Sequence, residues 1–155
     1  MKIIGIHFTE ISAEKISQLK GALEINSNLD IEDIKKEEMN VSKISSLIFD
    51  FNYLVSYNPN MAKIRLKGQT VVFDDQNESE NILKEWKKKK FEHSMKIPLL
   101  NFILAKCSMK SIQLADELGL PPHVNLPQIT PDSKEAVKNS KHAVKDSKNS
   151  ASYTG

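Results

Sequence analysis

The hydrophobic pattern of this 155-residue chain changes once, between Phe73 and Glu78. Before this point apolar residues alternate with polar ones, as in strands with one buried face, and after it they recur about every 3.6 residues, as in helices. A chain whose strands all precede its helices predicts an α+β fold, with a four-stranded antiparallel sheet followed by two helices packed on one face. The other face of the sheet would then be available to a partner.

The first two strands are predicted from short alternations. The first ends near Ser12, and the second carries odd-numbered apolar residues up to Ile31, with a bulge at residues 26–28 and a solvated loop at residues 35–38. Residues 13–23 are interpreted as a connection, although their Lys and Gln content also allows a short helix that Gly21 would interrupt.

The third strand has the strongest pattern, because its odd positions are all large and apolar: Leu47, Phe49, Phe51, Tyr53, Val55 and Tyr57. Residues 58–61 have turn chemistry, so we predict a hairpin that pairs Tyr57 with Ala62, Val55 with Ile64 and Tyr53 with Leu66. The same register pairs Ser56, Leu54, Asn52 and Asp50 with Lys63, Arg65, Lys67 and Gln69 on the outer face. An aromatic row can also stack nucleic-acid bases, but its apolar partners favour a core. Gly68 is expected to mark a bend.

Two helices are predicted after the sheet. The first is expected to begin at Ser79 and Glu80 and to carry Ile82, Leu83 and Trp86 on one side. The second begins near Pro98 and ends at Gly119, with its apolar stripe at Leu100, Ile103, Leu104, Cys107, Ser111, Leu114, Ala115 and Leu118. A proline-rich segment, residues 120–127, follows, and we expect Leu120, Val124 and Leu126 to hold it against the core.

The composition becomes polar after Thr130, and a repeat of seven residues begins at Ser133 and again at Ser140. The repeats contain too few apolar residues to offset the entropy of ordering them. We therefore divide the chain into an α+β domain at residues 1–130 and a disordered, basic heptad-repeat tail at residues 131–155. A tail that becomes helical on an acidic partner is the alternative.

The composition limits where the protein works. The single cysteine cannot form an internal disulfide, no N-terminal signal sequence is evident, and no apolar run approaches the roughly 20 residues that span a bilayer. We expect a cytoplasmic protein that does not insert into membranes. The net charge of +2 is too small to indicate nucleic acid by itself.

No set of residues predicts a catalytic or metal site. The histidines, His7, His93, His123 and His142, fall in different elements without ligand spacing. Cys107 lies in an apolar stripe, where a structural role is favoured over nucleophilic catalysis. We therefore expect no enzyme activity, no catalytic residue, no metal and no cofactor.

Binding is favoured instead, and basic and aromatic residues are the candidates. Trp86, beside a run of lysines, could either cap the core or line a groove. The basic residues could hold RNA phosphates or an acidic segment, or simply keep the surface soluble. The candidate binding residues are Lys63, Arg65, Lys67, Trp86, Lys87, Lys88, Lys89, Lys90 and Phe91.

Two short stretches resemble the SecB family of export chaperones. Glu10-Ile11-Ser12-Ala13-Glu14 stands where that family carries an Asp-Ile-Ser-Phe-Glu pattern, and residues 120–127 resemble its proline-rich closing segment. The order of elements over residues 3–129 is similar as well. The resemblance implies a SecB-like fold, assembly into dimers of dimers, and the holding of unfolded polypeptides in apolar grooves without nucleotide. Two features depart from the family: Ala13 replaces the aromatic residue, and the outer face is basic where the family is acidic and docks a translocation motor.

The leading hypothesis is therefore a non-enzymatic, protein-binding module of the holdase-chaperone type that captures unfolded or extended polypeptide and can form a homo-oligomer. The alternative is an RNA- or ribosome-associated factor that uses the basic outer face and the tail.

Overall fold

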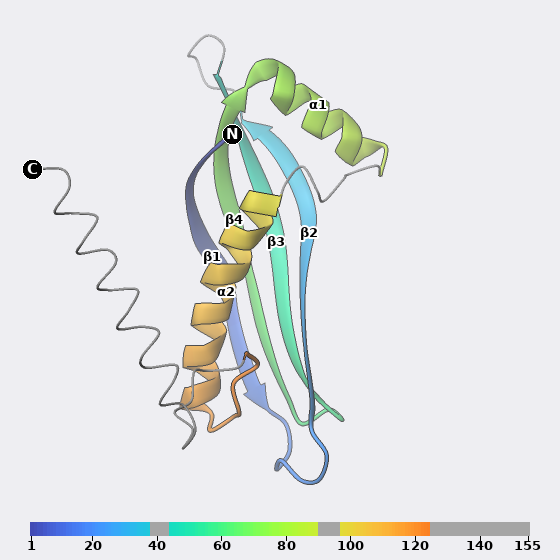
Figure 1. Cartoon of the computed structure of the whole chain (residues 1–155), viewed down its shortest axis with the longest axis vertical. Helices are drawn as coiled ribbons and strands as arrows, with labels where there is room; N and C mark the ends of the chain where they lie inside the picture. The colour runs from blue at the N-terminus through green and yellow to red at the C-terminus, as the bar shows by residue number, and fades with distance from the viewer. Residues whose placement is uncertain (38–43, 90–96, 125–155) are drawn as a thin grey trace, which may run out of the picture. The chain divides into compact units, whose positions relative to one another are not determined.

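The computed structural model describes residues 1–37, 44–89 and 97–124. Four long strands form one antiparallel sheet in the order β1-β4-β3-β2, and two helices follow them (Figure 1). The elements are β1 (Lys2–Lys15), β2 (Glu24–Glu37), β3 (Ile44–Asn58), β4 (Ala62–Asp75), α1 (Gln76–Lys87) and α2 (Ile97–Glu117). The predicted α+β class, with all strands before all helices, is confirmed.

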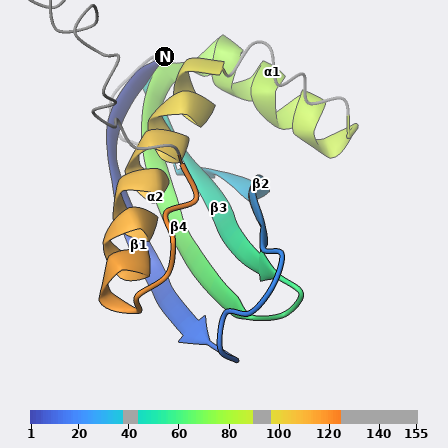
Figure 2. The same ribbon diagram turned by 60° about the horizontal axis from the view of Figure 1, so that its bottom comes forward.

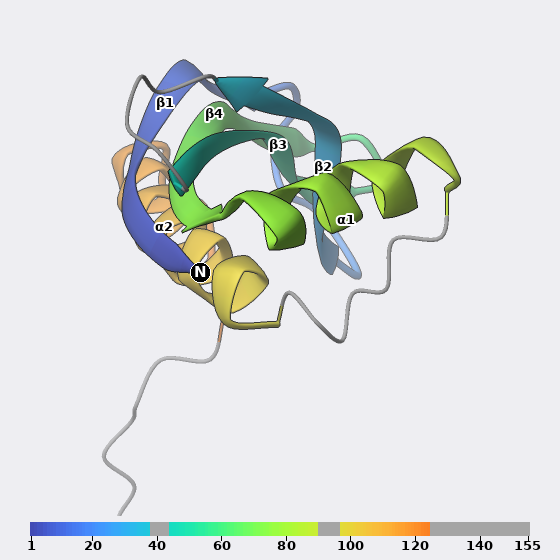
Figure 3. The same cartoon turned by 90° about the horizontal axis from the view of Figure 1, so that it is seen from above.

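Both helices cover the same face of the sheet (Figure 3). Helix α2 packs along β1, β4 and β3, whereas α1 packs toward the β2 side (Figure 2). Their fully buried residues, which include Ile82 of α1 and Leu99 and Ile103 of α2, join a single core with the inward residues of β3 and β4. The sheet therefore has a covered inner face and an outer face without a helix in the described part of the chain.

The inward row of β3 is the centre of this core. Its members are all at most 1% exposed: Leu47, Phe49, Phe51, Tyr53, Val55 and Tyr57. Because β3 has a strand on each side and helices above it, its aromatic side chains are shielded from every direction, and burying each stabilises the fold by about 1.5–3 kcal/mol. The predicted core role of the aromatic row is confirmed.

The predicted hairpin register is also confirmed at every pair. Tyr57 lies opposite Ala62 and Ser56 opposite Lys63, and the pairing continues in step to Asp50 and Gln69. The turn contains a cis Asn58–Pro59 bond, and the Met61 amide donates to the Tyr57 carbonyl oxygen at 2.8 Å.

The edge strands are longer than the sequence indicated. Strand β1 continues past Ser12 to Lys15, because β4 offers it backbone partners along its whole length. Residues 16–23 form a connection without a helix, so the helical alternative was wrong, and Gly21 adopts φ +74° there.

Strand β2 departs from the prediction in two places. Its register shifts between Ile31 and Asp33, so the bulge lies at Glu32 rather than at residues 26–28. Residues 35–37 belong to the strand instead of a solvated loop, because they pair with β3, while Glu38 lies outside the described residues.

Gly68 lies inside strand β4, which continues through it to Asp75, with Phe51 paired on one side and Phe8 on the other. The register between β1 and β4 shifts beside this glycine, between Phe8 and Glu10. The two phenyl rings meet edge to face, with centroids 6.2 Å apart and planes at 80°. A Cβ atom at position 68 would lie 2.6 Å from Phe51 Cζ and would also collide with the His7 carbonyl oxygen. The glycine is therefore needed for the close approach of three strands.

Helix α1 begins three residues before the predicted start. The Asp75 carboxylate caps it by accepting a hydrogen bond from the Asn77 amide at 2.9 Å. Asp75 is the N-cap residue and has the extended backbone geometry usual at that position. Ser79 therefore does not cap the helix and is a buried residue within it.

Helix α2 begins beside Pro98 as predicted, and Gly119 ends it with φ +63°. The predicted apolar stripe omitted Leu99, which is fully buried, and included Leu104, which is 40% exposed. After the helix Leu120 is buried, as expected, but Val124 is 37% exposed and does not hold the segment to the core. Leu126 and the heptad-repeat tail lie outside the described residues.

Substituting Gly68 by alanine should lower the free energy of unfolding by about 1–3 kcal/mol, because the added methyl group must displace either the Phe51 ring or the β1 backbone. Chemical denaturation followed by circular dichroism would measure the loss. The matched control is Gly5→Ala, since a Cβ atom at Gly5 of the neighbouring strand meets nothing within 4 Å. Equal free energies of unfolding for the two variants would show that the close contacts at Gly68 do not limit the stability of the fold.

Candidate functional site

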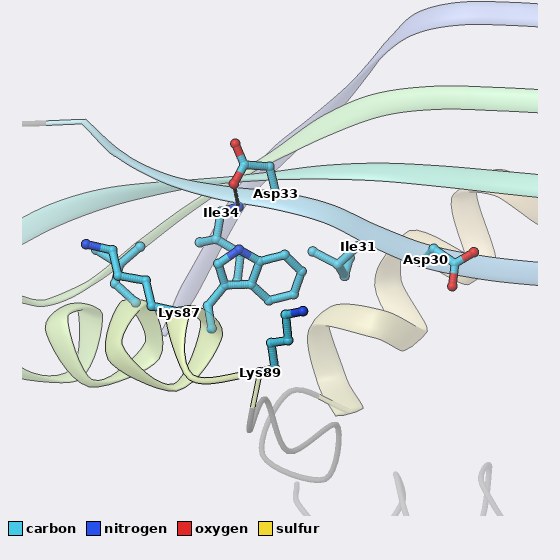
Figure 4. Close-up of a pocket in the computed structure, with 8 residues that line it drawn as sticks. Asp30, Ile31, Asp33, Ile34, Lys87 and Lys89 are labelled. Atoms are coloured by element: carbon cyan, nitrogen blue, oxygen red, sulfur yellow. Dashed lines mark hydrogen bonds between the residues drawn. The ribbon is translucent and has the colours of Figure 1, made fainter.

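A pocket of about 670 Å³ lies between β2 and α1 (Figure 4). Its volume falls within the roughly 300–1,000 Å³ that is usual for binding sites. Apolar side chains form its walls and charged ones its margin. The lining residues are Asp30, Ile31, Asp33, Ile34, Leu83, Trp86, Lys87 and Lys89.

The bulge in β2 builds one wall of this pocket. Residues three apart in a regular strand point to opposite faces, but Ile31 and Ile34 lie opposite Phe51 and Phe49, two inward residues of β3. The extra residue at Glu32 restores Ile34 to the inner face. In Figure 4 both isoleucines project from β2 toward the helix.

The last turns of α1 build the opposite wall. Leu83 and Trp86 are three residues apart and therefore share a helix face, and both are half-buried against the core. Ile82 is fully buried and fixes the helix on the sheet. The Lys89 amide donates to the Trp86 carbonyl oxygen at 3.0 Å, and Lys89 adopts φ +54°, which ends the helix at the margin of the pocket.

The margin of the pocket carries both signs of charge. The Asp33 carboxylate accepts a hydrogen bond from the Ile34 amide at 2.9 Å and points away from α1, whereas Lys87 and Lys89 reach from the helix toward β2 (Figure 4). Further along the two elements, Lys36 Nζ of β2 lies 4.0 Å from Glu80 Oε1 of α1. A ligand in the pocket would therefore have apolar contacts inside and ionic contacts at the margin.

Strand β2 is also an edge of the sheet, since β3 is its neighbour on one side and the described chain places no strand on the other. An edge strand presents backbone donors and acceptors that can pair with an added strand. The pocket and this edge are continuous, because Asp30, Ile31, Asp33 and Ile34 belong to both.

Of the candidate binding residues, the structure places Trp86, Lys87 and Lys89 at the pocket. Lys88 is exposed between them and does not line it, and Lys90 and Phe91 lie outside the described residues. The β2 wall was missed. Its only signal in the sequence was the break in odd-even alternation between Ile31 and Ile34, which indicates a bulge that keeps both residues on one face.

The other candidates, Lys63, Arg65 and Lys67, lie on the outer face, away from α1, because they alternate with the buried Ile64 and Leu66. The register places Glu14 and Glu10 of β1 opposite Lys63 and Lys67, and Lys67 Nζ lies 3.3 Å from Glu32 Oε1. These basic residues are therefore interspersed with acidic ones and do not continue into the lysines of α1. This mixed arrangement of charges gives no support to the RNA or ribosome alternative.

The outer face also holds a polar network around Asp50. Its carboxylate accepts hydrogen bonds from Lys35 Nζ at 2.6 Å and from Gln69 Nε2 at 2.7 Å. Burial by itself would raise the pKa of Asp50, but these two hydrogen bonds and the Lys35 charge outweigh it and hold the pKa below its usual value. The network thus ties β2, β3 and β4 together across the outer face.

Burial raises the pKa of the Cys107 thiol to about 12, so the thiol stays protonated and unreactive at neutral pH. His7 is exposed on β1, and His93 and His142 lie outside the described residues. Among the described residues, no group of three or more His, Cys, Asp or Glu side chains is placed to hold a metal ion. None of the described helices is both long and apolar enough to cross a membrane.

No family model matches the sequence, and no curated protein sequence matches it. Among solved structures, the chain is similar to the SecB-like chaperone Rv1957 of Mycobacterium tuberculosis, determined in complex with a ChAD peptide from the Rv1956 HigA1 antitoxin. The likeness covers 83% of this chain and 90% of that chain, at 16% sequence identity and a TM-score of 0.48.

The Asp50 network should make stability acid-sensitive. A carboxylate with a lowered folded pKa stabilises the fold above its unfolded pKa, near 3.8, and that contribution is lost as pH falls through the folded value. Asp50→Asn should lower the free energy of unfolding at pH 7 by about 1 kcal/mol and flatten its decline below pH 4. Urea unfolding between pH 2 and 7 would measure both.

Asp30→Asn is the matched control, because Asp30 is an exposed β2 carboxylate that accepts from Asn28 within its own strand. With this substitution the free energy of unfolding should decline at acidic pH as it does in the unaltered protein. If Asp50→Asn retained the full acid-dependent decline, the network would contribute nothing to it.

Proposed function

We propose that this protein is a non-enzymatic polypeptide-binding module, of the holdase-chaperone type, and that extended segments of unfolded chains bind along β2 and α1. The observation that carries the proposal is the continuity of an apolar pocket of about 670 Å³ with the edge of a long strand. Binding there requires no nucleotide, metal or covalent step.

The two parts of this site recognise different parts of a polypeptide. Backbone groups of a bound segment can pair with the edge of β2, which works for any sequence except proline. The wall of Ile31, Ile34, Leu83 and Trp86 can take apolar side chains that project inward from the added strand. Backbone pairing provides broad recognition, and the pocket favours segments that a folded protein would bury.

The charged residues at the margin of the pocket limit which polypeptide segments can enter it. Asp33 is hydrogen-bonded to the strand and directed outward, and the exposed Lys87 and Lys89 are on the helix side. Surface charges at an edge strand also discourage uncontrolled pairing between copies of the chain. Self-assembly remains part of the proposal, since β1 forms the second edge of the sheet, exposes Ile4 and Ile11, and is followed directly by the exposed Ile16.

Trp86 provides a direct test in the unaltered protein, because it is the only tryptophan of the chain and it lines the pocket. Titration with a short, tryptophan-free peptide rich in leucine and valine should shift its fluorescence emission saturably, since apolar side chains replace water beside the indole. The same protein in excess should suppress the light scattering of an aggregating, chemically unfolded client.

Leu83→Glu should weaken peptide binding at least about tenfold, because it places a charge on the apolar wall. Leu104→Glu is the matched control, since Leu104 is an exposed leucine of α2 outside the pocket. Urea unfolding would show that both variants fold. Unchanged Trp86 emission at saturating peptide, together with full suppression of scattering by Leu83→Glu, would overturn the proposed site.

A further inference from the structure

The chain folds back over the end of the core after α2. Gly119 adopts φ +63°, the Leu120 amide donates to the Ala115 carbonyl oxygen at 2.8 Å, and the Leu120 side chain is only 6% exposed. We call residues 120–124 the strap. Its direction is set by the glycine turn and by two prolines, Pro121 and Pro122, which restrict the backbone.

The strap is attached to two tyrosines of the β3 core row. The Tyr57 hydroxyl donates a hydrogen bond to the Pro121 carbonyl oxygen at 2.7 Å. The His123 ring packs edge to face on the Tyr53 ring, with centroids 6.1 Å apart and planes at 63°. One polar contact and one ring contact thus fix the strap beyond the burial of Leu120.

The surroundings of His123 are unusual for an imidazole. Both ring nitrogens are shielded from solvent, and neither has a hydrogen-bond partner among the described residues. A buried polar group without a partner costs free energy, and a buried charge without one costs more. The ring can therefore pack here as the neutral form, whereas the imidazolium would need water at both nitrogens.

The ionisable groups around Tyr53, on which the His123 ring packs, offer no compensating charge. Tyr53 and Tyr57 of β3 and Cys107 of α2 all have pKa values raised by burial, so all three are neutral in the acidic and neutral range. From β2 and α2, Ser27 and Ser108 lie near the Tyr53 hydroxyl and carry no charge. Burial lowers the pKa of His123 from its ordinary 6.5, with no charged side chain contributing.

We propose that His123 is a proton-sensitive latch for the strap: the neutral ring holds it on Tyr53, and protonation releases it, which uncovers the tyrosine end of the core. The histidine is suited to this because its charge changes in the mildly acidic range. The Tyr57 bond to Pro121 contributes to strap closure without depending on pH in that range.

The sign of the effect follows from linkage. The closed state holds His123 with a lowered pKa, and the released state restores it to near 6.5. Closure is therefore fully favoured above pH 6.5 and weakens as pH falls from 6.5 toward the closed-state pKa. Within that window the ratio of released to closed strap should rise roughly tenfold per pH unit.

Nuclear magnetic resonance of the full chain would test this. The C2 proton of His123 should titrate with a midpoint below 6.5, and the Overhauser contacts between the His123 and Tyr53 rings should disappear with acid over the same range. His123→Phe keeps an aromatic ring on Tyr53 and removes the ionisable group, so its ring contacts should persist through the same pH range.

Tyr57→Phe is the second comparison, because it removes the bond to Pro121 and leaves His123 in place. It should increase strap release at every pH without abolishing the pH dependence. A midpoint at or above 6.5, or ring contacts that persist through the midpoint, would overturn the latch. If His123→Phe did not fold, the titration of the unaltered protein would still decide.

Discussion

The packing of the β3 inward row against both helices is the interaction on which the rest of the structure depends. Strand β3 lies between β2 and β4, and its inward aromatic and aliphatic side chains are excluded from water. Burial of this row fixes the register of the central hairpin, since a shift by one residue would turn the whole row outward. The edge strands, the helices and the strap then pack around this buried row.

One consequence is that the sheet edges carry the features of functional interest. The bulge at Glu32 keeps Ile31 and Ile34 facing inward beside α1, although the pairing register with β3 shifts there. A bulge and surrounding charges also limit indiscriminate pairing at an edge. The same local irregularity therefore builds an apolar wall and makes the edge less regular, and both features suit the polypeptide binding proposed above.

A second consequence concerns the tyrosines, which combine a large apolar ring with a polar end. Tyr53 and Tyr57 fill the core with their rings. The Tyr57 hydroxyl and the Tyr53 ring both contact the strap that follows α2. The core row thus extends from the pocket side of the sheet to the strap. The polar end of Tyr57 holds the strap by a hydrogen bond that a phenylalanine could not make.

Periodicity in the sequence was enough to determine the α+β class, the hairpin register from Tyr57 and Ala62 to Asp50 and Gln69, and the start of α2, because these depend on which local face is apolar. It did not reveal the role of Gly68, the wall formed by Ile31 and Ile34, or the surroundings of His123. Those depend on three strands meeting at one point, on an inserted residue, and on segments separated by 70 positions in the chain, from Tyr53 to His123. Only the tertiary structure brings such groups together, because a contact between distant segments leaves no period in either of them.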